Sequence, residues 1–135
     1  MLTDSAVRRF RPALIAVVVG LVVGVSVGAR TQGKRDVTVV AHKYGYKVDG
    51  GGSEIRVQQD DLVRITFSTD DIPHSFTMED ETYRVMRRAE PGKPVTFDFR
   101  ADKPGKFTFQ CTLRADDRCK EMQGTLIVEP RKSPR

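Results

Sequence analysis

The feature that most limits the fold is a series of short runs in which apolar and polar residues alternate, between residues 37 and 129. Clusters rich in Asp, Gly, Pro and Lys separate these runs, and such clusters are typical of turns. Alternation with a period of two indicates half-buried β-strands, and no helical periodicity of useful length interrupts it. Several short strands at nearly regular spacing predict an all-β fold, an antiparallel Greek-key sandwich or barrel. The predicted strands are 37–39, 54–58, 63–67, 83–86, 95–99, 107–111 and 125–129.

The same alternation predicts which side chains face the core. Cys111 continues the inward series of Phe107 and Phe109, so it is expected where that strand leaves the core. Met78 and Met86 are expected to fill space in the core. The other inward residues are expected to be Val39, Ile55, Val57, Val63, Ile65, Phe67, Val95, Phe97, Phe99, Leu126 and Val128.

The N-terminal part of the chain differs from the rest in composition. An uncharged run of 17 residues, short for a membrane span and long for a signal-peptide core, follows three arginines. Basic residues come directly after the run and favour an uncleaved anchor over a cleaved signal. We expect a membrane anchor or signal helix at 1–30, a linker at 31–36, one domain at 37–130 and a basic tail at 131–135. The three arginines place the domain on the extracytoplasmic side (periplasmic or extracellular), membrane-anchored, or secreted if cleavage occurs.

The net charge of +5 does not belong to the predicted domain. Residues 37–130 hold 14 Lys and Arg against 16 Asp and Glu, so the basic surplus lies in the two tails. Nucleic-acid binding is therefore not expected. A phosphate-binding loop is not expected either, because Gly50-Gly51-Gly52 is followed by no helix and is typical of a hairpin tip.

The chemistry of the chain is concentrated in one segment between two predicted strands. It holds both cysteines, Cys111 and Cys119, together with Met122. In an exported chain, two cysteines are plainly expected to form a disulfide, here closing a loop of about eight residues. Three sulfur atoms in a short loop also suit copper, and His74 in an upstream turn could supply a nitrogen ligand. The second histidine, His42, is expected as an exposed strand residue rather than a ligand.

Three segments resemble the cupredoxin superfamily, in particular the copper-binding domain of cytochrome c oxidase subunit II and small membrane-anchored cupredoxins. Residues 71–76 are similar to a D-x-x-H-S-F turn whose His is a copper ligand in that family. Residues 105–111 are similar to the segment that delivers the first ligand Cys, and residues 122–128 to the segment that closes the ligand loop with Met. The resemblance implies a cupredoxin-like sandwich over residues 37–129.

The ligand loop departs from the dinuclear pattern C-x-x-x-C-x-x-x-H-x-x-M of that family. Counted from Cys111, the second Cys position falls on Ala115 and the His position on Cys119, while Met122 keeps the Met position. A dinuclear centre is not expected without the second bridging Cys, nor an ordinary blue-copper site without the second His. The resemblance then implies one copper ion, held by His74, Cys111, Cys119 and Met122.

Such a ligand set implies an exported copper-binding protein for electron transfer or copper handling, with a redox or copper-transfer protein as its partner. A closed site with four protein ligands leaves no position for a substrate, so we expect no enzymatic activity. Two alternatives stay open at the level of sequence. The first is a Cu(I) storage or delivery protein without redox cycling, and the second is a metal-free, disulfide-stapled β-sandwich that serves as an interaction module.

Overall fold

The computed structural model describes residues 32–114 and 116–132, and these residues form two packed β-sheets. The anchor or signal helix expected at residues 1–30 lies outside the described residues, as does the end of the basic tail. Within the described part of the chain, no helix is long and apolar enough to cross a membrane. The first strand begins at Lys34, three residues before the expected start of the domain.

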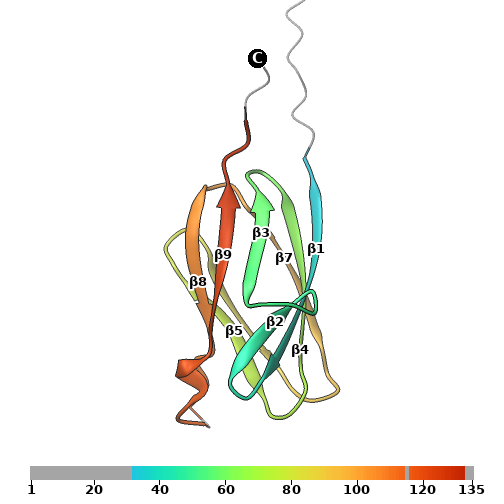
Figure 1. Cartoon of the computed structure of the whole chain (residues 1–135), viewed down its shortest axis with the longest axis vertical. Helices are drawn as coiled ribbons and strands as arrows, with labels where there is room; N and C mark the ends of the chain where they lie inside the picture. The colour runs from blue at the N-terminus through green and yellow to red at the C-terminus, as the bar shows by residue number, and fades with distance from the viewer. Residues whose placement is uncertain (1–31, 115, 133–135) are drawn as a thin grey trace, which may run out of the picture.

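Nine strands and one 3₁₀ helix make up the described chain (Figure 1). In chain order they are β1 (Lys34–His42), β2 (Gly45–Val48), β3 (Glu54–Gln58), β4 (Leu62–Thr69), β5 (His74–Glu79), β6 (Arg84–Ala89), β7 (Val95–Arg100), β8 (Gly105–Gln110), η1 (Cys119–Glu121) and β9 (Gln123–Glu129). One sheet has the order β2-β1-β4-β7, and the other has the order β3-β9-β8-β5-β6. The all-β sandwich predicted from the alternation is therefore confirmed.

The strand directions differ from the expected antiparallel arrangement. β1 pairs with β4, and β3 pairs with β9, in parallel, whereas the remaining paired strands are antiparallel. Alternation reports which face a residue occupies and carries no information on strand direction. The expected hairpin at Gly50-Gly51-Gly52 is also wrong, because β2 and β3 belong to different sheets and these glycines connect them.

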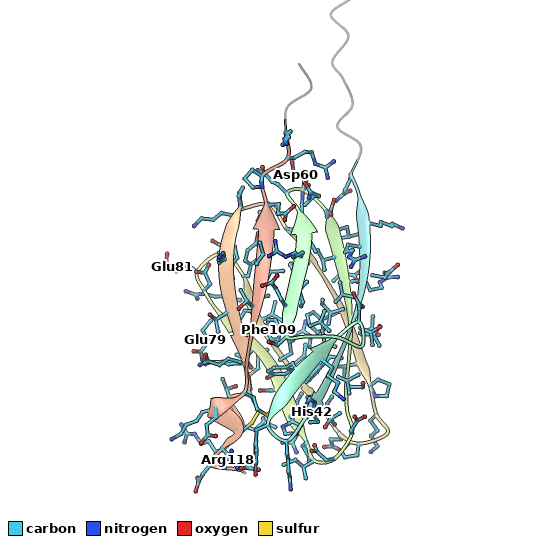
Figure 2. The ribbon with its side chains drawn as sticks, in the orientation of Figure 1. His42, Asp60, Glu79, Glu81, Phe109 and Arg118 are labelled. Carbon is cyan, nitrogen blue, oxygen red and sulfur yellow. A yellow bond between two sulfur atoms is a disulfide. The ribbon has the colours of Figure 1, made fainter. Side chains whose placement is uncertain are left out.

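Aromatic rings fill the space between the two sheets. Phe76 of β5 stacks on Phe109 of β8 with ring centroids 4.5 Å apart, and Phe67 and Phe97 of the opposite sheet lie 6.0 and 5.4 Å from Phe76. Figure 2 shows Phe109 between the sheets. A Cβ atom at Gly124 of β9 would overlap the Phe109 ring, so this position accepts only glycine without rearrangement. Eleven of the thirteen predicted inward residues are buried, and Phe67, Phe97 and Phe109 are among them.

The residues whose burial differs from the prediction lie mainly on edge strands. Val95 and Phe99 are half-buried, because their strand β7 is the last of its sheet and one side of each is uncovered. Met78 is buried as expected, but the prediction for Met86 is wrong, since its side chain is 58% exposed. Met86 follows the inward-facing Val85 on the edge strand β6, so it lies on the outer face. His42, expected to be exposed, is half-buried at the end of β1.

Candidate metal centre

The predicted ligands meet at one end of the sandwich, around the short helix η1. This end is opposite the one where β1 begins and β9 finishes (Figure 1). Figure 2 shows the same separation, with Arg118 beside η1 and Asp60 at the far end. The described chain thus enters and leaves the domain far from the candidate site.

His74 is the first residue of β5 and is held there by the carboxylate of Asp71. The Asp71 side chain accepts hydrogen bonds from the backbone N–H groups of Ile72 (2.7 Å) and Lys43 (2.7 Å), and its Oδ1 lies 2.8 Å from Nε2 of His74. Burial by itself raises the pKa of the Asp71 carboxyl, but these two N–H groups and His74 outweigh it and lower the pKa to about 2. An ionised carboxylate only accepts hydrogen bonds, so Nε2 of His74 carries the proton and donates it.

The other ring nitrogen of His74 is the one available to a ligand. Because Nε2 is the N–H group, Nδ1 of the neutral ring has a free lone pair. The side chain is fully buried, and Nδ1 has no hydrogen-bond partner in the described structure. A buried polar atom without a partner is costly and calls for an explanation, such as an ion or water that completes the site. Nδ1 of His42 is also buried without a partner, but only His74 belongs to a group of described His, Cys and acidic side chains that could hold a metal ion.

Cys111 directly follows β8, at the point predicted from the series of Phe107 and Phe109. Its backbone N–H donates to the carbonyl oxygen of Met122, and its Sγ accepts the backbone N–H of Ser75 at 3.5 Å. Ser75 is itself fixed on both sides. Its carbonyl oxygen accepts the Tyr46 hydroxyl at 2.6 Å, and its Oγ accepts the N–H of Thr112 at 2.8 Å. The first sulfur therefore lies in a rigid setting at the edge of the core.

Cys119 and Met122 come from η1 and the residue that ends it. Cys119 is joined to Cys111 by a disulfide, with Cα atoms 5.2 Å apart. The backbone N–H of Met122 donates to the carbonyl oxygen of Cys119, so Met122 is bonded through its main chain to both cysteines. The Met122 side chain is fully buried in the same apolar cluster. The structure thus contains the disulfide that the sequence left open as the alternative to a metal site.

Donor atoms of His74, Cys111 and Cys119 lie within 4.8 Å of one another, and all three residues are buried. Among the described residues, this is the one group of His, Cys and acidic side chains close enough together to hold a metal ion. Its free Nδ1 and two sulfur atoms are a suitable donor set for copper once the sulfurs are thiolates. The assignment of these residues and Met122 as ligands remains a prediction.

Sequence reasoning did not identify the residues that orient these groups. Asp71 belongs to the segment that carries the resemblance, so its presence was visible, but its bond to His74 was not inferred. The bond from the Ser75 N–H to Cys111 could not be predicted, because every residue type except proline has the same backbone N–H group. Nothing in the sequence indicated that the guanidinium of Arg118 lies 4.0 Å from the ring centroid of Tyr44.

Comparison with known proteins gives the same fold. A family model described as a cupredoxin-like domain matches residues 13–128. A chain of a heme-copper terminal oxidase dimer superposes with a TM-score of 0.63 at 24% identity, covering 75% of this chain and 67% of that one. The periplasmic domain of cytochrome oxidase subunit II from Bradyrhizobium japonicum gives a TM-score of 0.63 at 17% identity, with 74% and 87% covered.

A further solved structure contains subunit II of cytochrome c oxidase in a mixed disulfide intermediate with a thioredoxin-like protein. The superposition has a TM-score of 0.60 at 17% identity and covers 74% of this chain and 85% of that one. Identities at this level establish a shared fold.

Proposed function

Because this chain belongs to the cupredoxin-like domain family, we propose that its reduced form binds one copper ion through His74, Cys111, Cys119 and Met122, for electron transfer or copper handling. Two observations carry the proposal: Nδ1 of His74 is buried without a hydrogen-bond partner, and a donor atom of His74 lies within 4.8 Å of both sulfur atoms. A metal ion bound to this nitrogen would explain why it has no hydrogen-bond partner.

The donor set favours Cu(I). One imidazole nitrogen, two thiolates and a thioether form a soft set that stabilises the monovalent ion over Cu(II). Zn²⁺ is less suited, because its usual protein ligands are thiolate, imidazole and carboxylate. Copper bound here would supply a one-electron couple or a transferable Cu(I) ion. With four protein ligands and complete burial, the site has no open position for a substrate, so we propose a carrier or binding protein rather than an enzyme.

The disulfide and the copper site use the same two sulfur atoms, so the oxidised form lacks both thiolates. We propose that a dithiol protein of the thioredoxin class reduces it, as a mixed disulfide intermediate with such a protein exists for the related subunit II. A partner thiolate attacks one sulfur, and the other cysteine leaves as a thiolate. The second partner thiol then attacks the mixed disulfide, so two electrons reach this chain and the partner becomes the disulfide.

We further propose an extracytoplasmic, membrane-anchored domain. The support is the uncharged run at residues 13–29 with arginines before it, and the periplasmic location of the related domain of subunit II. Since the described chain enters the domain at the end opposite η1, an N-terminal anchor would leave the site facing away from the membrane (Figure 1). A soluble redox or copper-transfer partner could then reach it.

A second candidate function is favoured by the disulfide itself. If Cys111 and Cys119 stay joined in the native compartment, the protein is a metal-free sandwich stapled at one end, which serves as an interaction module. The unpaired His74 Nδ1 has no role in that function, which is why copper binding is preferred.

A titration of the full-length, reduced protein with Cu(I) under anaerobic conditions tests the proposal. We expect one tightly bound equivalent, and weaker binding in His74→Ala and Met122→Ala. His42→Ala is the matched control, because His42 is not in the group of described side chains that could hold a metal ion, and it should bind as the wild type does. Intense thiolate-to-copper absorption after oxidation supports an electron carrier, whereas a colourless ion that resists oxidation supports Cu(I) handling. No binding, or equal loss in all three variants, contradicts the proposed site.

A further inference from the structure

The candidate ligands are shielded from solvent, so something must open before copper or a reductant reaches them. Cys111 and Cys119 are each 1% exposed, and His74 and Met122 are completely buried. The two cysteines cannot be attacked in this closed state, because a thiolate has to approach a sulfur atom along the disulfide axis. Opening of the polypeptide that covers the site is therefore a step in its chemistry.

The segment 116–122, which carries Cys119 and η1, is attached to the end of β8 by the disulfide to Cys111 and by the bond from the Cys111 N–H to the Met122 carbonyl oxygen. The other hydrogen bonds of the segment lie within it. Cys119 donates its N–H to Asp116, Glu121 donates its N–H to the carbonyl oxygen of Arg118, and the Arg118 side chain pairs with Glu121 at 3.0 Å. These bonds persist if the segment moves as a unit. These internal bonds stabilise its shape, whereas its attachment to the domain at Cys111 is at one side of the segment.

One polar side-chain contact of this segment reaches a different part of the chain. The Arg118 guanidinium lies 4.0 Å from the ring centroid of Tyr44, in the turn between β1 and β2. That turn is fixed on the other side of the site, because the N–H of Lys43 donates to Asp71, which in turn holds His74. Arg118 thus connects the Cys119 segment to the ligand-bearing end of β5 through a rigid turn.

We propose that the Arg118–Tyr44 contact is a latch that keeps the Cys119 segment closed over the site and sets the rate at which thiols and copper reach the buried sulfur atoms. The contact crosses from the moving segment to the fixed turn, so it is lost when the segment opens. Its loss in a variant then raises the population of the open state. Opening rates matter for copper only if the proposed function holds, but access to the disulfide can be measured without copper.

The size of the effect follows from the strength of a cation–π contact. Such contacts at partly exposed positions are worth about 1 kcal/mol, which corresponds to about a fivefold change in the population of the open state. If closing is fast compared with the chemical step, the reduction rate follows that population. We therefore expect removal of either partner to accelerate reduction of the disulfide by about fivefold.

The test is the rate of disulfide reduction by dithiothreitol in the full-length protein, with Tyr44→Leu, Arg118→Gln and the double variant. Each single variant should be about fivefold faster than the wild type, and the double variant no faster than the singles, because both remove the same contact. Lys120→Gln is the control for charge beside Cys119, and Glu121→Gln is the control for the ion pair within the segment. Both controls should stay near the wild-type rate.

Several outcomes overturn the latch. Wild-type rates in Tyr44→Leu and Arg118→Gln do so, and so does an equal acceleration in Lys120→Gln, which would assign the effect to charge alone. Additive acceleration in the double variant also contradicts it. Tyr44 packs against the core, so the unfolding free energy of Tyr44→Leu is measured together with its reduction rate. If Tyr44→Leu does not fold, Arg118→Gln decides the test, because the Arg118 side chain is exposed. None of these results depends on copper binding, so the latch and the proposed function fail separately.

Discussion

The substitution Asp71→Asn should separate the role of this carboxylate in positioning His74 from its role in stability. As an ionised acceptor, Asp71 makes Nε2 of His74 the protonated nitrogen and leaves Nδ1 without a hydrogen-bond partner. An asparagine amide can rotate and donate to Nε2 instead, which moves the ring proton to Nδ1. The variant keeps the shape of the site but allows the tautomer that cannot bind a metal through Nδ1.

The loss in copper affinity should be about 10- to 100-fold, the usual cost of removing a residue that orients a metal-binding histidine. The loss in stability of the metal-free protein follows from the carboxyl pKa, which is about 2 against an ordinary value of 3.8. That shift corresponds to about 2 kcal/mol, which we reduce to about 1–2 kcal/mol because the side chain is 30% exposed and partly screened.

The pH dependence supplies the signature. A folded-state pKa below the unfolded value stabilises the protein above the unfolded pKa, so the contribution of Asp71 is complete above about pH 4 and is lost as the pH falls toward 2. Urea unfolding of the metal-free, disulfide form at pH 7, 4 and 2.5 measures it. The stability difference between wild type and Asp71→Asn should narrow below pH 4. A difference that stays constant over this range, or unchanged copper affinity in the variant, would refute the reasoning.

Three further predictions concern the surroundings of the site. Gly124→Ala should lower the unfolding free energy by about 1–3 kcal/mol in a urea titration, because its Cβ overlaps the Phe109 ring, and wild-type stability would show that the ring moves freely. Tyr46→Phe should cost about 1–2 kcal/mol by leaving the buried carbonyl of Ser75 unpaired. Burial also raises the pKa of Tyr46, so wild type and Tyr46→Phe should give the same phenolate absorption in ultraviolet titrations of the folded protein, and one extra phenolate in the wild type before unfolding would contradict this. Reduction of the disulfide should cost about 2.5 kcal/mol, since the bridge spans eight residues, and Cu(I) should restore stability; a reduced protein that copper does not stabilise would oppose the proposed site.

The alternation of the sequence predicted the core well because burial is a property of each strand by itself. Phe67, Phe97 and Phe109 were placed inward from their parity alone, and all three are buried. The parallel pairing of β1 with β4, and of β3 with β9, depends on which strands meet across the sandwich, and no local pattern encodes that. Met86 was misassigned for a different reason, because its expected burial did not follow the alternation: the neighbouring Val85 faces inward, so Met86 lies on the outer face.

The candidate site was predicted as a set of residue types and not as an arrangement. The spacing of Cys111 and Cys119 and the segment around His74 were sufficient to bring these residues into one hypothesis, and the structure places their donor atoms close together. Orientation was beyond the sequence, because the proton on His74 is determined by Asp71 and the bond to Cys111 comes from a backbone N–H. Contacts between distant loops, such as that of Arg118, arise only in the folded chain.

The central claim is that Nδ1 of His74 is a copper ligand, and long-range ¹H–¹⁵N spectra of the histidine rings test it most directly. The chain has only two histidines, so His42 serves as an internal control in the same spectrum. One equivalent of Cu(I) added to the reduced protein should shift the Nδ1 resonance of His74, leave its Nε2 protonated and leave His42 unchanged. Spectra in which neither nitrogen of His74 responds, or in which Nε2 binds and Asp71 is released, would contradict the account.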